Sequence, residues 1–296
     1  MTDEHQLDAA ESRLIAEAAQ YLENPTLLMQ LANLVGKPLE LGARWVEKLA
    51  PETVSQIVEG ALTRALALAV STIPATSDET PADASAEGDA RVGARTSFWH
   101  NLSVAATGAT GGFFGIAGLP IELPVTTVVM LRSIATIARE HGEDLSKPDV
   151  LLQCLSVFSL GGTGKAEDAM ESSYITARMG MQQFVTQAAR VTAQASSEEL
   201  LRMLQKGTAP ALVNVIAKIA SRFNVAVTQK LMAQAIPVVG ALSGASINVA
   251  FMEHFNKVAR YHFGIRRLER KHGEAVIQAA YQAAVEGARA RTIQSK

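Results

Sequence analysis

Apolar residues recur three and four positions apart along most of the chain, which is the spacing of one face of a helix. In residues 7–22, for example, Leu14, Ile15 and Leu22 share a face and Arg13 lies opposite. The pattern predicts helices over residues 7–22, 26–35, 38–50, 51–71, a stretch ending near 141, 149–160, 166–194, 197–205, 209–234, a stretch ending near 271, and 273–292. Because no segment alternates polar and apolar residues as a strand would, the predicted fold is all-α, a multi-helix bundle.

Two stretches interrupt this amphipathic pattern because they contain no charged residue. They span residues 102–121 and 231–252, so at 20 and 22 residues both are long enough to cross a bilayer. Both are rich in small residues and broken by glycine and proline, which favours close helix packing over contact with lipid. We therefore expect two glycine/proline-rich apolar helical segments packed in the core. Insertion into a bilayer and peripheral contact with one remain open.

Candidate contacts with a membrane or a partner are glycines and one proline of these stretches. Two arginines from the basic end of the helix ending near 271 are further candidates. Together these candidates are Gly108, Gly112, Gly115, Pro237, Gly240, Gly244, Arg266 and Arg267. A basic helix end can bind anionic headgroups, or it can be a solvated face.

Residues 72–94 differ from the rest of the chain because they are acidic and contain few large apolar residues. Such a segment cannot offset its ordering entropy by burial. It is predicted to be a flexible linker between an N-terminal helical region, residues 1–71, and a second domain, residues 95–296.

Polar residues are set into two of the apolar helices. Asn248, His262 and Glu269 fall on an otherwise apolar stripe of the helix ending near 271. Arg132 lies between apolar pairs, so it is predicted to be buried and paired, because an unpaired buried charge is strongly destabilising. Glu122 is expected at a helix start, where the dipole favours an anion. The candidate polar cluster, structural or ligand-binding, is Glu122, Arg132, Arg139, Glu143, Asp144, Asn248, His262 and Glu269.

Neither a metal nor a cofactor site is predicted. His254 and His262 are weak metal candidates because residues eight apart on a helix diverge by about 80°. The glycines of residues 161–165 lack the serine or threonine of a phosphate-binding loop and follow a predicted helix. Cys154 lies among leucines, as a buried small hydrophobe would.

Composition narrows the class of protein further. A net charge of −2 argues against binding of nucleic acid. A single cysteine excludes an intrachain disulfide and fits a reducing compartment. The N-terminus does not have the basic and apolar regions of a signal peptide, so a cytoplasmic protein is expected.

Several short motifs together resemble the EcsC family of bacterial proteins, over about residues 95–273. They are residues 118–124 (GLPIELP), 131–135 (LRSIA), 142–144 (GED), 154–158 (CLSVF) followed by glycines 161 and 162, 236–241 (IPVVGA) with Asn248, and 262–269 (HFGIRRLE). The resemblance implies a helical domain at the cytoplasmic face of the membrane, linked to transport or secretion. It implies no reaction.

Three functions follow as hypotheses. The favoured one is a non-enzymatic, membrane-associated protein that binds lipid or a membrane protein at the inner face of the cytoplasmic membrane. The second is a hydrolase or metal-binding protein that uses the buried Glu/Arg/His cluster. The third is a soluble scaffold that forms homo-oligomers through the two uncharged stretches.

Overall fold

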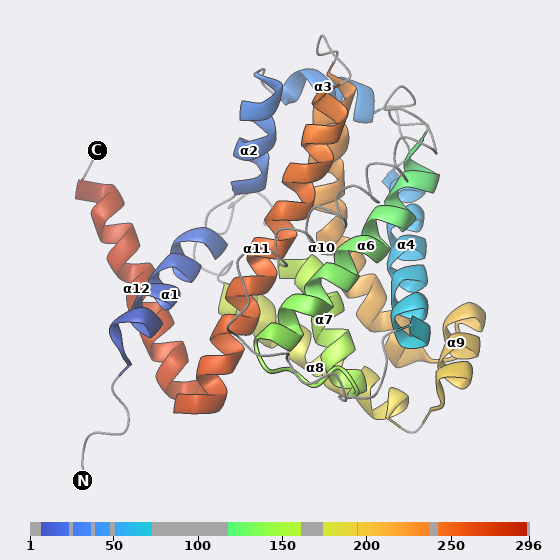
Figure 1. The fold of residues 1–296 in the computed structure, drawn as a ribbon. Helices are drawn as coiled ribbons and strands as arrows, with labels where there is room; N and C mark the ends of the chain where they lie inside the picture. Colours follow the sequence, from blue (N-terminus) through green and yellow to red (C-terminus); the bar gives the residue numbers. More distant parts are fainter. Residues whose placement is uncertain are drawn as a thin grey trace, which may run out of the picture.

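The computed structural model contains eleven helices within its described residues and no strand there, so the predicted all-α fold is confirmed (Figure 1). The structure describes residues 7–23, 26–36, 39–47, 51–72, 118–160, 174–193, 195–236 and 242–294. The helices are α1 (Ala9–Leu22), α2 (Thr26–Val35), α3 (Glu40–Val46), α4 (Pro51–Thr72), α6 (Leu119–Glu140), α7 (Pro148–Leu160), α8 (Tyr174–Thr192), α9 (Ser197–Lys206), α10 (Pro210–Ala235), α11 (Leu242–His272) and α12 (Glu274–Gln294).

Local capping residues set several of these boundaries. Asp8 caps the first turn of α1 because its carboxylate accepts a hydrogen bond from the Glu11 N–H, and the Glu11 carboxylate accepts one from the Asp8 N–H. Ser196 and Glu199 form the same reciprocal cap at α9, which ends at Gly207 with a φ of 63°. These caps satisfy backbone groups that a helix end leaves unpaired, and a left-handed residue such as Gly207 stops the helix.

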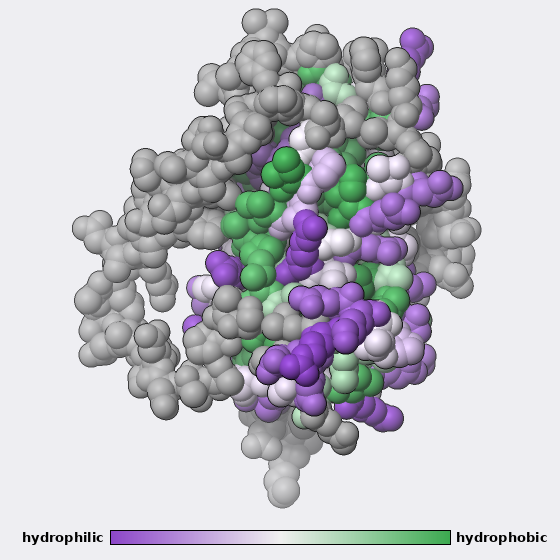
Figure 2. Space-filling model, turned by 90° about the vertical axis from the view of Figure 1, so that its right-hand side faces the viewer, coloured by the Kyte–Doolittle hydropathy of each residue, from purple (hydrophilic) through white to green (hydrophobic). Residues whose placement is uncertain are grey.

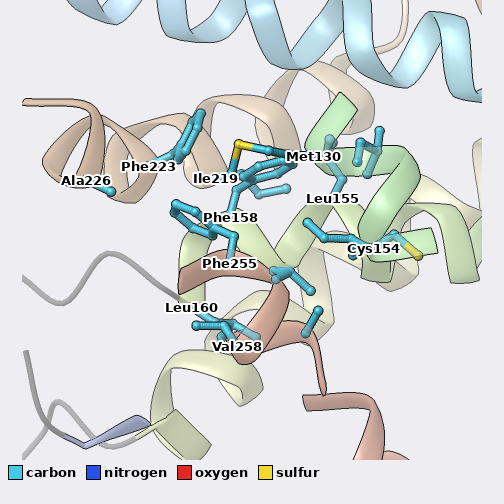
Figure 3. Packing of buried hydrophobic residues seen from close by; sticks show 14 of the residues in the cluster. Met130, Cys154, Leu155, Phe158, Leu160, Ile219, Phe223, Ala226, Phe255 and Val258 are labelled. Atoms are coloured by element: carbon cyan, nitrogen blue, oxygen red, sulfur yellow. The ribbon is translucent and has the colours of Figure 1, made fainter. Parts of the chain in front are cut away.

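The longest helices, α10 and α11, run through the middle of the bundle (Figure 1). A cluster of phenylalanines holds them together with α7. The ring centroids of Phe158 and Phe223 are 4.7 Å apart, and Phe255 lies 5.4 Å from each of them. Figure 3 shows these rings converging with Met130 of α6, while Cys154 of α7 is buried in the same core as predicted. Tilted and edge-on aromatic pairs of this kind add to the free energy of apolar burial.

The uncharged stretches are described only in part. Residues 102–117 and five of the candidate contacts lie outside the described residues: Gly108, Gly112, Gly115, Pro237 and Gly240. Gly244 belongs to the first turn of α11. In the second stretch, Leu231, Ile247 and Phe251 are buried in the core. These side chains pack inside the bundle, whereas Val249 of the same stretch is exposed.

Among the described residues, three helices are apolar and long enough to cross a membrane by length and composition. They are Glu52–Val70 within α4, Leu119–Glu140 and Pro210–Ala235. In the structure α4 packs along α6 and against α10, so each helix turns part of its surface toward the others. These properties are compatible with membrane association.

Helices of the predicted N-terminal region share one core with the later helices, because α3 and α4 both pack on α10. At Gly42 of α3 the two backbones approach so closely that an added Cβ atom would stand 2.0 Å from the Met232 carbonyl oxygen. Residues 73–94 lie outside the described residues, so the predicted linker and the domain boundaries remain predictions.

Candidate functional site

Helix α11 carries three of the eight residues of the candidate polar cluster, and they lie at two separate ends of the helix. Asn248 lies near its start, whereas His262 and Glu269 lie near its end. Between them, His254 is buried and its Nδ1 lies 2.9 Å from the Tyr21 hydroxyl of α1. The candidates on α11 therefore do not form one cluster.

At the first end, Glu122 forms an ion pair with a buried lysine. Helix α6 begins at Leu119 with Pro120 in its first turn, and Glu122 lies in the same turn, where exposed N–H groups favour an anion. The Lys230 ammonium donates to Glu122 Oε1 at 2.6 Å and lies 5.2 Å from the centre of the Phe251 ring. Burial alone would raise the pKa of Glu122, but the charge and hydrogen bond of Lys230 outweigh it, so the pKa is lowered.

Two amide side chains also contact the Glu122 carboxylate. Gln234 Nε2 lies 3.5 Å from the same Glu122 oxygen, and Asn248 donates a side-chain hydrogen bond to the carboxylate. Within the described residues, the buried Oδ1 of Asn248 has no hydrogen-bond partner. The structure thus brings together Glu122 and Asn248, both sequence candidates, with Lys230, which sequence reasoning missed. The predicted helix over 209–234 also contains Lys218 and Arg222, so the available signal was only that Lys230 directly precedes the uncharged stretch 231–252.

At the other end of α11, one carboxylate serves two arginines. Glu143 is buried in the loop after α6 and accepts hydrogen bonds from Arg266 Nε at 2.8 Å and Nη2 at 3.2 Å. It also accepts one from Arg270 Nη1, and Arg270 Nη2 donates to the His141 carbonyl at 2.6 Å. Burial would raise the pKa of Glu143, but the two guanidiniums lower it overall. The loop can turn here because Gly142 has a φ of 79°.

Next to this group, Arg178 of α8 forms a bidentate ion pair with Glu269, with N–O distances of 2.7 and 2.6 Å. Arg178 also donates to the Tyr174 hydroxyl, which is 2.8 Å from His262 Nδ1. Within the described residues, the buried Nε2 of His262 has no hydrogen-bond partner. Burial lowers the pKa of His262 well below its ordinary value, and Arg178 and Arg266 lower it further, so the ring is neutral.

A carboxylate at the end of α1 ties these elements together. Glu23 Oε1 accepts hydrogen bonds from the Tyr174 backbone N–H at 2.9 Å and from the Tyr281 hydroxyl at 3.2 Å. Burial raises the pKa of Tyr174 to about 12, so its hydroxyl stays protonated at neutral pH. The contacts join α1, α8, α11 and α12 at one end of the bundle.

A cavity of about 320 Å³ opens beside this network, between α8, α11 and α12. Its wall combines arginine and glutamate side chains with apolar ones. The lining residues are Tyr174, Ile175, Arg178, Met179, Gln182, Ile265, Arg266, Glu269, Arg270, Glu274, Ile277, Gln278 and Tyr281.

A comparison with models of protein families tests the resemblance to the EcsC family. The model of the EcsC protein family matches residues 20–268. The chain belongs to the EcsC family. The match begins at residue 20 rather than near residue 95, so α2, α3 and α4 are part of the EcsC region, whereas α12 and most of α1 lie beyond it. No curated protein and no solved structure matches the chain.

The structure of this EcsC protein corrects the prediction for Arg132. Arg132 is exposed, as are Val125, Thr136 and Arg139, which lie on the same side of α6. The face of α6 that packs into the EcsC bundle runs instead through Leu123, Thr127, Met130, Ile134 and Ala138. Arg132 therefore lies outside the buried polar groups, and its predicted burial is wrong.

The remaining candidates of the EcsC chain lie apart from one another. Asp144 is exposed and accepts hydrogen bonds from Ser146. Arg267 is exposed, whereas Arg266 is held by Glu143. His254 and His262 each bond to a different tyrosine, and the part of the chain that is described contains no group of three metal-ligating side chains.

Proposed function

We propose that this EcsC family protein is a peripheral membrane protein that binds a lipid bilayer with one end of its helical bundle, at the inner face of the cytoplasmic membrane. The observation that carries the proposal is the distribution of exposed apolar side chains. Nine large hydrophobic residues are exposed among the described residues, and six of them lie on α2 and on the first two turns of α6 and α11. These six are Leu28, Met29, Leu34, Ile121, Val125 and Val249.

These elements lie at the upper end of the molecule in Figure 1, where α3 also lies. The space-filling view of the neighbouring face shows hydrophobic residues along its upper and middle part and a band of hydrophilic residues below (Figure 2). Single exposed apolar side chains scattered over a surface need no explanation. A group of them at one end of a helical bundle favours contact with a membrane or a partner. We name the six residues the apolar end.

Hydrophobic contact, rather than charge, would drive this binding. The net charge of the chain is −2, which does not favour attraction to anionic headgroups. Complete burial of one valine or isoleucine contributes about 1.5–3 kcal/mol, so a few inserted side chains suffice for reversible binding. Binding should therefore persist at high salt.

The test is flotation of the full-length protein with vesicles of phosphatidylcholine and phosphatidylglycerol. Val125→Glu is expected to lower the bound fraction by about tenfold or more, because it loses apolar burial and adds a charge to desolvate. Val213→Glu is the matched control: Val213 is 46% exposed and Val125 is 50% exposed, but Val213 lies at the start of α10, near the opposite end.

Three outcomes would count against the proposal. The first is wild-type protein that stays at the bottom of the gradient with both lipids. The second is equal loss in Val125→Glu and Val213→Glu. The third is a fall in mass of Val125→Glu in light scattering with unchanged flotation, which would assign the apolar end to self-association. Retention of the protein in vesicles after alkaline carbonate extraction would indicate spanning helices instead of peripheral binding.

A further inference from the structure

The cavity between α8, α11 and α12 lies far from the apolar end. Along α11, Asn248 near the start and Arg270 at the cavity are 22 residues apart, or about 33 Å at 1.5 Å per residue. A protein docked through its apolar end therefore holds this cavity away from the bilayer, open to soluble molecules.

Charge at the cavity is unevenly balanced. Arg178 is matched by Glu269 in a closed bidentate pair. Arg266 and Arg270, in contrast, share the single carboxylate of Glu143, so this group of three carries a net charge of +1. Partly buried guanidiniums bind carboxylate and phosphate groups well because their N–H donors match the geometry of an oxyanion.

The one further carboxylate in the cavity wall is Glu274, which is exposed at the start of α12 and accepts a hydrogen bond from Gln278. Its negative charge offsets the +1 of the group formed by Arg266, Arg270 and Glu143, so the guanidinium donors, rather than a net charge of the whole cavity, would hold an anion. Glu274 does not pair with the arginines in the contacts of the described residues.

The rest of the wall combines apolar side chains with two glutamines. Its aliphatic part is Ile175 and Met179 of α8, Ile265 of α11 and Ile277 of α12. At about 320 Å³ the cavity falls within the size range of small-molecule sites, about 300–1,000 Å³. An apolar wall next to paired arginines suits a molecule with one anionic group and a hydrocarbon or aromatic body.

We propose that this cavity binds a small soluble anion of that kind, with its carboxylate or phosphate group at Arg266 and Arg270 and its apolar body against Met179 and Ile277. Helix α12 supplies one wall and lies beyond the residues that the family model matches. The site is thus a feature of this chain in addition to its EcsC region, and it does not depend on the proposed membrane binding.

The experiment is isothermal titration calorimetry of the full-length protein, in low salt, with octanoate, phenyl phosphate and inorganic phosphate. Octanoate, phenyl phosphate or both are expected to bind saturably at one site per chain. Inorganic phosphate alone is expected to bind at least about tenfold more weakly, because it cannot use the apolar wall. Failure of both amphipathic probes to bind would overturn the proposal.

Two pairs of variants locate the site. Arg270→Gln removes the excess charge but keeps the Glu143–Arg266 pair, and it is expected to weaken probe binding about tenfold. Arg267→Gln makes the same charge change on the neighbouring exposed residue, which does not line this cavity, and should change binding less than about twofold.

The second pair adds a negative charge without touching the ion pairs. Gln182→Glu places it in the cavity wall and should weaken binding, whereas Gln183→Glu, also exposed, should not. Equal behaviour within either pair would show non-specific attraction and refute the site. Arg270→Gln should leave vesicle flotation unchanged; a loss there would place the anionic group on a lipid headgroup and refute the soluble ligand. Val125→Glu should leave probe binding unchanged, so the two proposals fail separately.

Discussion

Replacing Glu122 by glutamine is expected to destabilise the fold more than any exposed ion-pair change. Its partner Lys230 is 1% exposed, so the substitution leaves a buried ammonium without a counter-charge. Breaking a buried pair in this way costs about 3–5 kcal/mol. Because the Glu122 side chain is 31% exposed and water reaches the pair from that side, we expect a loss near the lower limit, about 3 kcal/mol.

The double variant Glu122→Gln/Lys230→Met removes the buried charge together with its partner. Methionine matches the length of lysine and keeps contact with Phe251, so the free energy of unfolding should return to within about 1 kcal/mol of wild type. Glu198→Gln is the control, because the Glu198–Arg202 pair is exposed and should lose less than about 1 kcal/mol.

Urea unfolding followed by circular dichroism at pH 7 measures all these variants. The explanation fails if Glu122→Gln loses less than about 1 kcal/mol, or if the double variant is no more stable than Glu122→Gln alone.

The pH dependence of stability provides a second check. The pKa of Glu122 is lowered from 4.5 in the folded state, so the pair stabilises fully above that value. The difference between wild type and Glu122→Gln should shrink as the pH falls below 4.5 and Glu122 takes up a proton.

Two further outcomes are expected from the packing. Gly42→Ala should destabilise by about 1–3 kcal/mol in thermal unfolding because its Cβ would meet the Met232 carbonyl, whereas Gly60→Ala, with open space around it in α4, should stabilise by about 0.5–1 kcal/mol; equal effects would contradict the close approach. Cys154 is fully buried and burial raises the pKa of its thiol, so a thiol reagent should modify it only after denaturant is added, as measured by mass spectrometry.

The sequence was sufficient for the positions of the helices. Helix α9 was predicted at 197–205 and spans Ser197–Lys206, and α10 was predicted at 209–234 and spans Pro210–Ala235. Signals for such boundaries are local, because a capping serine, a proline in the first turn or a left-handed glycine acts within four residues. Periodicity then identifies the elements without any knowledge of their neighbours.

The orientation of α6 could not be predicted in the same way. Its residues include many of intermediate or small size, and Thr126 and Thr127 are buried although they are polar. Thr127 can be buried because its hydroxyl donates to the Leu123 carbonyl of its own helix at 2.7 Å. With threonines on the buried face and Val125 on the exposed one, hydropathy did not distinguish the two faces, and Arg132 was placed on the wrong one.

Lys230 was missed for a different reason. A lysine in an apolar helix usually extends its ammonium to solvent, so the sequence around Lys230 predicts an exposed side chain. Its burial depends on Glu122, which is 108 positions away in the chain. No local pattern contains such a pairing, and only the fold creates it, because α6 and α10 both pack against α4 and α11.

The pairing of charges also favours one orientation on a membrane over the other. The end of α11 is basic in sequence, which made Arg266 and Arg267 candidates for headgroup contact. In the structure Glu143 holds Arg266, and Glu11 of α1 pairs with Lys271 at 2.7 Å. Lys271 gains little from anionic lipid, because binding would first have to break its pair with Glu11. The Arg266 side chain is only 18% exposed, so a small molecule in the cavity can reach it, whereas a headgroup at a flat bilayer surface cannot. The apolar end offers exposed side chains with no such cost, which is why we place the bilayer there and the cavity in solvent.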